Sequence, residues 1–187
     1  EMEDTVAWIA GAKIFQKNGK RVNESFMRPL VEQIDCASIP AEVTPRYGFL
    51  TGQADIRVLP TNDPLYDGPG DSFIDNLQAS ALDAGTPLVI FHQSRDGEWL
   101  YAVTDIVSGW IPARFVASAD SETFLRRYRE PAKLLVTSAR ADLYADEKLT
   151  SFIGYARMGT TLVLAEDDAA PSSGGSPSNG GSSSPAG

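Results

Sequence analysis

The chain has 187 residues and a hydrophobic content of 42%, which is ordinary for a globular protein of one or two domains. Its formal net charge of -9 argues against nucleic acid as a partner, because sequence-independent affinity for phosphate backbones comes from clustered Lys and Arg. A single cysteine excludes an intrachain disulfide, and no apolar run approaches the ~18 residues that span a bilayer.

Residues 1–45 are predicted to form a short helical segment followed by a linker. Apolar residues recur at helical spacing within residues 1–17, and a second short helix is expected over 28–33, with Pro29 in its first turn. Such short helices need to pack on a larger unit to be stable. No signal segment precedes them, but the sequence begins with Glu1 rather than Met, so this says little about the compartment.

The next segment, residues 46–118, is predicted to be a small barrel. Residues 54–58 alternate as a half-buried strand does, and residues 72–82 are expected to form one or two helical turns with Phe73 and Leu77 on one face. Asp96-Gly97 is a signal for a two-residue hairpin, since Gly readily takes the positive φ of such a turn. The strand after it, 99–103, is apolar on both faces, so something besides the barrel core should cover it.

Four spaced motifs in this segment resemble one known family. They are I-R-x-L-P-T (56–61), D-x-x-x-D-x-L-Q (71–78), G-T-P-L (85–88) and S-x-D-G-x-W-x-Y-x-V (94–103), followed by Gly109-Trp110. Together and in this order they resemble the first bacterial SH3 (SH3b) domain of NlpC-type cell-wall cysteine peptidases. The resemblance covers roughly residues 46–118.

The chain then repeats itself after a predicted connector helix at 119–130. Gly159-Thr160-Thr161-Leu162 echoes Gly85-Thr86-Pro87-Leu88, which indicates a second, incomplete SH3-like barrel over 131–168. Residues 169–187 comprise 19 residues, 15 of them Gly, Ser or Pro, and are predicted to be a disordered tail or loop. We expect the remaining strands of the second barrel, and a catalytic domain after them, to lie beyond Gly187; a terminal linker is the alternative.

The expected fold is therefore mainly β: an SH3-like small barrel, then a second, incomplete SH3-like barrel, with a short helical N-terminal segment. Two chemistries compete within it. Cys36 and His92 could form a nucleophile and its base, but Cys36 follows a predicted helix instead of opening one. We favour a small buried residue for Cys36 and a strand position for His92. With one histidine, the sequence gives no case for a metal site, and no cofactor is expected.

Aromatic and charged residues of the first barrel supply the candidate binding site. Aromatic side chains either fill the core of a barrel this small or line a groove for a peptide or a neighbouring domain. Acids at such a groove could pair with a free peptide amine, although turn capping explains them as well. The candidates are Trp99, Tyr101, Trp110, Asp71, Asp75 and Arg57.

The resemblance implies the function. It predicts an accessory and targeting region of a peptidoglycan hydrolase in the cell envelope, periplasmic or extracellular, whose partners are a C-terminal peptidase domain and cell-wall stem peptides. In this family that domain cuts the γ-D-glutamyl to diaminopimelate bond, so the present chain is expected to be no enzyme by itself. A stand-alone envelope module that binds peptidoglycan or a protein is the alternative, and a small hydrolase using Cys36 and His92 is a third hypothesis.

Overall fold

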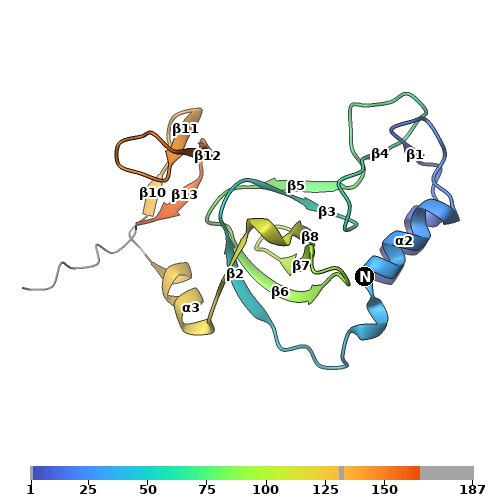
Figure 1. The fold of residues 1–187 in the computed structure, drawn as a ribbon, viewed down its shortest axis with the longest axis horizontal. Helices are drawn as coiled ribbons and strands as arrows, with labels where there is room; N and C mark the ends of the chain where they lie inside the picture. Colours follow the sequence, from blue (N-terminus) through green and yellow to red (C-terminus); the bar gives the residue numbers. More distant parts are fainter. Residues whose placement is uncertain (1, 131–132, 165–187) are drawn as a thin grey trace, which may run out of the picture.

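The computed structural model describes residues 2–130 and 133–164, and its main feature is one antiparallel sheet of seven strands (Figure 1). The strand order is β5-β3-β8-β7-β6-β2-β9. The strands are β2 (Arg46–Leu50), β3 (Ala54–Arg57), β5 (Gln78–Leu82), β6 (Pro87–Gln93), β7 (Trp99–Val103), β8 (Ser108–Pro112) and β9 (Val116–Ala119). The expectation of a mainly β fold is confirmed. The edge strands β5 and β9 are not paired with each other, so the sheet is curved but is not a closed barrel.

The hairpin between β6 and β7 forms where the sequence predicts it, but its loop is longer than two residues. The Ser94 amide bonds the Trp99 carbonyl at 2.9 Å, so residues 95–98 make a four-residue loop. Gly97 has φ +79°, the left-handed conformation that glycine adopts most easily. The Asp96 carboxylate accepts hydrogen bonds from Ser94 Oγ and the Glu98 amide, which fixes the wider turn.

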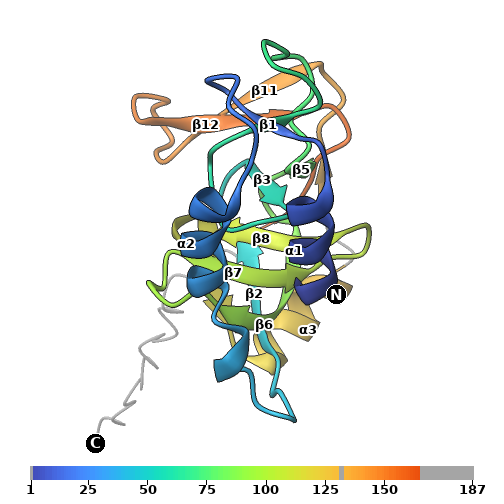
Figure 2. The same cartoon turned by 90° about the vertical axis from the view of Figure 1, so that its right-hand side faces the viewer.

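Two apolar cores cover the two faces of β7 and β8. Leu100 and Ile111 belong to the core enclosed by the curved sheet, whereas Trp99 and Trp110 belong to a second core on the outer face. Helices α1 (Met2–Gly11) and α2 (Glu24–Ile34) pack on that outer face (Figure 2). The N-terminal helices are thus the cover that the apolar 99–103 strand requires.

The N-terminal helices differ in extent from their prediction. Asn23 caps α2 through its side-chain oxygen, which accepts from the Phe26 amide at 3.1 Å, so the helix begins four residues earlier than expected. Pro29 consequently lies inside α2 and not in its first turn. α1 ends at Gly11, and the chain continues into β1 (Phe15–Gln16), which pairs with β4 (Leu65–Tyr66).

The C-terminal end of α2 is tied to β6 and the β6–β7 loop by three contacts. The Arg95 amide bonds the Gln33 carbonyl at 2.9 Å, and the His92 ring Nε2 lies 2.7 Å from the Ile34 carbonyl. Arg95 also pairs with Asp35 at 2.8 Å. These contacts fix the helical segment relative to the sheet at the far end of the hairpin.

The long connection from β3 to β5 contains no helix. Residues 78–82 form strand β5, and the segment before it follows turns, so the predicted helical turns over 72–82 are wrong. Phe73 is 95% exposed whereas Leu77 is fully buried, and the two do not share a face. Hydrogen bonds to the Asp75 carboxylate hold this segment in place of a helical ladder.

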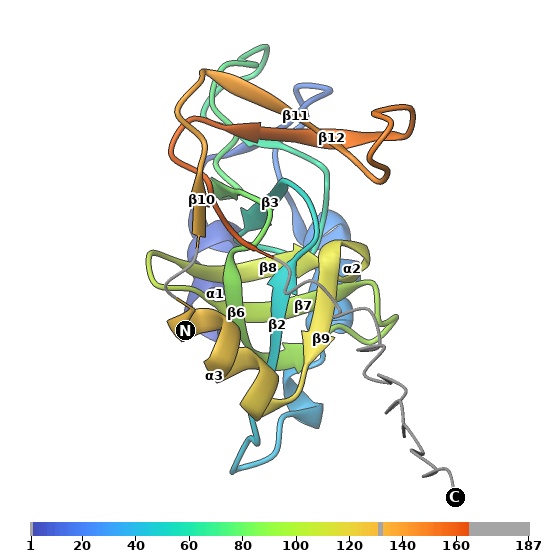
Figure 3. The ribbon, with the colours of Figure 1, turned by 90° about the vertical axis from the view of Figure 1, so that its left-hand side faces the viewer.

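After α3 (Ser121–Arg129) come β10 (Lys133–Leu135), β11 (Arg140–Tyr144), β12 (Phe152–Arg157) and β13 (Thr161–Val163) (Figure 3). β10 pairs with β13 as β2 pairs with β6, and β11 pairs with β12 as β3 pairs with β5. Backbone hydrogen bonds repeat as well. The Leu50 amide donates to the Thr86 carbonyl, and the Leu50 carbonyl accepts from the Gly85 amide. Val136 makes the same two hydrogen bonds with Thr160 and Gly159.

The two repeats meet at equivalent corners. Arg157 Nε contacts Asp83 Oδ1 at 2.8 Å, and Arg157 Nη2 donates to the Ala81 carbonyl at 3.0 Å. The predicted tail at 169–187 lies outside the described residues, as do 131–132 and 165–168. The proposed domain boundaries stay a prediction.

Glycine is required sterically where β8 lies against its neighbouring strand β3. A Cβ on Gly109 would lie 2.6 Å from the Arg57 carbonyl oxygen and 3.0 Å from Ile56 Cγ1. We therefore expect Gly109→Ala to lower the free energy of unfolding by about 1–3 kcal/mol, because backbone atoms must move. Urea denaturation measures this. Gly52→Ala, where a Cβ meets nothing within 4 Å, is the control, and equal midpoints for both variants would contradict the prediction.

The Asp35–Arg95 pair predicts a pH response. The hydrogen bond from Arg95 lowers the pKa of Asp35, so the stabilisation from this pair is complete above the ordinary carboxyl pKa. It is lost as the pH falls through the lowered pKa. In Arg95→Gln we expect the pKa of Asp35 to return toward its ordinary value, measured from the ¹³C carboxyl shift against pH. Arg140→Gln, which removes a distant surface pair, should leave the titration unchanged, and a titration that Arg95→Gln does not move would refute the assignment.

Candidate functional site

The three predicted aromatic residues lie together beneath the N-terminal helices. Trp110 is fully buried and Trp99 is 7% exposed, while Tyr101 is half-buried with its ring edge-on to Trp110 at 5.5 Å. Their packing against α1 and α2 agrees with the core role that the sequence offered as one alternative. A peptide-binding role for these residues stays a prediction.

Arg57 and Asp75 form the most buried ion pair among the described residues. Arg57 Nη2 lies 2.8 Å from Asp75 Oδ2, and the two side chains are 6% and 16% exposed. Asp75 Oδ1 accepts from the Leu65 and Leu77 amides, and Arg57 Nη2 also donates to the Asp63 carbonyl. The pair therefore fixes the long connection to strand β3. It also buries Arg57, although in an alternating strand over 54–58 Arg57 lies on the face opposite the apolar Ile56 and Val58.

Asp71, the remaining candidate, lies on the same connection but outside this pair. Its carboxylate accepts from the Phe73 amide at 3.0 Å, an ordinary turn contact between residues two apart. The structure brings Arg57 and Asp75 together and leaves Asp71 in its own turn.

Cys36 and His92 both lie near the end of α2. Cys36 begins a three-residue 3-10 helix, Cys36–Ser38, and packs half-buried against the outer core. The His92 ring uses Nε2 for the Ile34 carbonyl and lies edge-on to Trp110 at 5.9 Å. His92 lies in strand β6, as we favoured, whereas Cys36 is half-buried and not the fully buried residue that we expected. Among the described residues no group of three or more His, Cys, Asp or Glu is placed to hold a metal ion.

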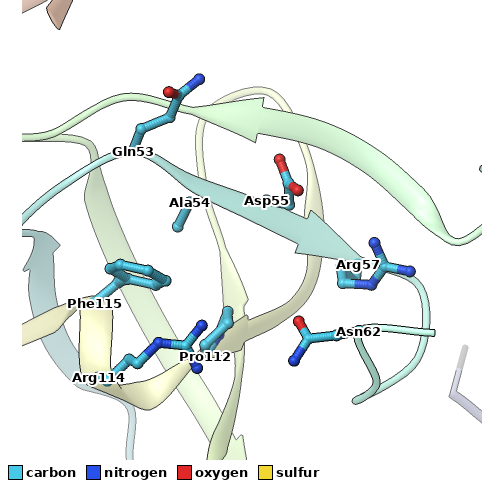
Figure 4. Close-up of a pocket in the computed structure, with 8 residues that line it drawn as sticks. All are labelled: Gln53, Ala54, Asp55, Arg57, Asn62, Pro112, Arg114 and Phe115. Carbon is cyan, nitrogen blue, oxygen red and sulfur yellow. The ribbon is translucent and has the colours of Figure 1, made fainter. Parts of the chain in front are cut away.

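A pocket of about 310 Å³ opens between β3 and the turn that follows β8 (Figure 4). Figure 4 shows Arg57 and Asn62 at one end and Arg114 and Phe115 at the other, with Pro112 between them. Arg114 stacks over the Phe115 ring with its Cζ 4.6 Å from the ring centroid. Gln53, Ala54 and Asp55 complete the lining. The residues that line the pocket thus include two arginines, one aspartate and two residues with side-chain amides.

Sequence reasoning identified only Arg57 of this lining. Arg114 and Phe115 follow Pro112 in a 3-10 turn, Ala113–Phe115, and belong to no periodic pattern. Gln53 and Asn62 lie in connections on either side of β3, where spacing gives no direction for a side chain. The one available signal was the Arg114-Phe115 dipeptide, which follows the strand that ends at Pro112 after one intervening residue.

Removing the charge of Asp75 is expected to be costly. Asp75→Asn keeps the shape of the side chain but leaves Arg57 as a buried cation without its partner, so we expect a loss of about 3 kcal/mol in the free energy of unfolding. The measurement is urea denaturation. Asp71→Asn, a matched change on the same connection, should cost less than about 1 kcal/mol. Similar losses of stability in the two variants would contradict the prediction that the Arg57–Asp75 pair is costly to break.

Comparisons with known proteins agree with this architecture. Residues 64–112 match the family model described as SH3 domain (SH3b1 type). The chain also resembles a solved structure reported as a novel NlpC/P60 endopeptidase from Photobacterium damselae subsp. piscicida, with 23% identity and a TM-score of 0.73. The match covers 88% of this chain and 37% of that one, so the chain spans little more than a third of the endopeptidase's length. A search of curated proteins finds no match.

The family match begins at Pro64, just before β4, and ends at Pro112, the last residue of β8. It includes Asp75 and the hairpin, and three of the four motifs fall within it. The structural likeness extends the shared fold to most of the remaining chain. The chain therefore contains an SH3b-type domain, as its motifs predicted, and has a fold consistent with the SH3b region of an NlpC-type protein.

Proposed function

We propose that this chain is an accessory and targeting region of a peptidoglycan hydrolase, acting at the cell envelope. The observation that carries the proposal is the SH3b1 match at residues 64–112, within a fold shared over 88% of the chain with an NlpC/P60 endopeptidase. In this role the chain binds the cell wall and stabilises a peptidase domain, while that domain performs the chemistry. None of the described helices has the length and apolar character needed to cross a bilayer.

The contacts of the described residues suit a binding role better than a catalytic one. The Cys36 and His92 side chains are both engaged in packing at the α2 end. The polar residues that line an open pocket are instead those of Figure 4, among them Arg114, Gln53 and Asn62. Donors and acceptors without a nucleophile are typical of recognition.

The proposal extends to recognition of stem peptides. Such peptides carry carboxylates and amides, and the pocket offers partners for both. A stand-alone envelope module would use the same surface without an attached peptidase domain. The coding sequence after Gly187 distinguishes the two, because the accessory role as proposed requires a Cys/His peptidase domain later in the same chain.

Binding to purified sacculi tests the cell-wall role. We expect the chain to co-sediment with sacculi and not with cellulose. Because the chain carries a net charge of -9 and stem peptides carry carboxylates, general electrostatics oppose this binding. Binding should therefore persist when salt is raised, since salt screens the repulsion. Equal recovery on sacculi and cellulose, or none on either, would refute the cell-wall role.

A further inference from the structure

Among the described residues, the second repeat has the outer strand pairs of the first repeat without the two strands that lie between them. In the first repeat β8 and β7 lie between β3 and β6 in the sheet. The counterparts of β3 and β6 are β11 and β13, which pair with β12 and β10. In the part of the chain that the structure describes, β11 and β13 therefore each have one edge that pairs with no strand.

The matching strands of the two repeats pair in the same register. Ala54 pairs with Leu82 in the first repeat, and Ala141 pairs with Ala156 in the second. The register shifts at the same place in both, directly after Ile56 in β3 and directly after Leu143 in β11. The first repeat therefore shows what each position of the second repeat faces when the two intervening strands are present.

The apolar residues of the second repeat are less buried than their counterparts. Ile56 is fully buried, whereas its counterpart Leu143 is half-buried. Ile90 is 2% exposed, whereas Leu164, which lies 74 residues later, is 47% exposed. Ala156 is the only apolar residue of the second repeat that is buried among those described. The second repeat thus presents an apolar face whose equivalent in the first repeat is covered by β7 and β8.

We propose that a β-hairpin from later in the same polypeptide covers this face, pairing with β13 and β11 as β7 and β8 pair with β6 and β3. Residues 165–187 follow β13 as the β6–β7 loop follows β6. They contain no Val, Ile, Leu, Met or aromatic residue, so they lack the side chains that two such strands need. The hairpin therefore follows residue 187, with apolar residues at the positions of Leu100 and Ile111.

The proposal rests on the proposed function only in requiring that the polypeptide continue after Gly187. The surface itself is defined by described residues. Backbone hydrogen bonds along two strand edges give affinity, and alternating side chains give specificity. An unpaired edge beside an apolar face also favours association with other chains. A second copy of this chain is therefore the competing occupant.

The experiment compares amide hydrogen exchange in the 187-residue chain and in the complete polypeptide. In the complete polypeptide we expect the β11 and β13 amides that are not bonded to β12 or β10 to exchange about tenfold more slowly or better, because new strands would bond them. Amides of β6 and β7 are the internal reference and should exchange equally in both. Equal exchange of the β11 and β13 amides in the two proteins would overturn the proposal, as would a coding sequence without two apolar strands after Gly187.

Leu164→Asp in the complete polypeptide tests the apolar face. Its counterpart Ile90 is buried, so a carboxylate at this position would oppose docking of the hairpin. We expect the protection of the β11 and β13 amides to be lost, while the β6 and β7 amides stay protected. Leu149→Asp is the matched control, because Leu149 is 65% exposed in the turn between β11 and β12. Equal effects of the two variants would contradict the assignment of the face.

Three further results separate the alternatives. If protection of the β11 and β13 amides rises with protein concentration, a second copy covers the face and the hairpin proposal is wrong. If these amides are protected at all concentrations but the protein does not bind sacculi, the hairpin stands and the proposed cell-wall function fails. If the protein binds sacculi and these amides remain unprotected, the function stands and the hairpin proposal fails.

Discussion

The buried ion pair between Arg57 and Asp75 organises the part of the molecule where the chain is least regular. Between β3 and β5 the chain forms one two-residue strand, β4, and otherwise follows turns. A long connection of this kind loses conformational entropy when it is ordered, and it has few backbone ladders to compensate. The Asp75 carboxylate supplies that order by holding two backbone amides and one guanidinium. Strand β4, and through it β1, depends on this arrangement.

The second constraint is the two-sided burial of β7 and β8. A sheet of an SH3-like fold has one face turned to its own core, and the opposite face of these strands still carries Trp99 and Trp110. The N-terminal helices cover that face, and they are short enough that the sheet in turn stabilises them. Neither unit is complete without the other. The outer core is consequently the interface between the N-terminal helices and the sheet.

Much of the sheet could be predicted because its signals are local. Asp96-Gly97 marks the hairpin, and the strand after it is recognisable from its apolar residues on both faces. The spaced motifs located the SH3b domain, and the Gly-Thr echo located the repeat. The loop size was missed because the Asp96 carboxylate stabilises a wider turn than the dipeptide suggests. The burial of Arg57 was missed because its partner Asp75 lies 18 residues away, beyond any periodic pattern.

The pocket could not be predicted for a related reason. Its lining comes from β3, from the connection after it and from the turn after β8, which only the sheet order brings together. Arg57 alone was identified, and it was assigned to a surface that would attract an amine. The structure pairs its charge with Asp75 and bonds it to the Asp63 carbonyl, so the Arg57 guanidinium holds the connection between β3 and β5.

The contact between the repeats has a consequence for how alike they can be. Asp83 and Arg157 occupy matching positions in the two repeats. They are 74 residues apart, as are Gly85 and Gly159. Two identical repeats would place the same charge on both sides of this corner and would repel each other there. The attraction exists only because the two copies differ at this position. The ion pair between the repeats therefore depends on a difference in their sequences, because one repeat carries the carboxylate and the other carries the guanidinium.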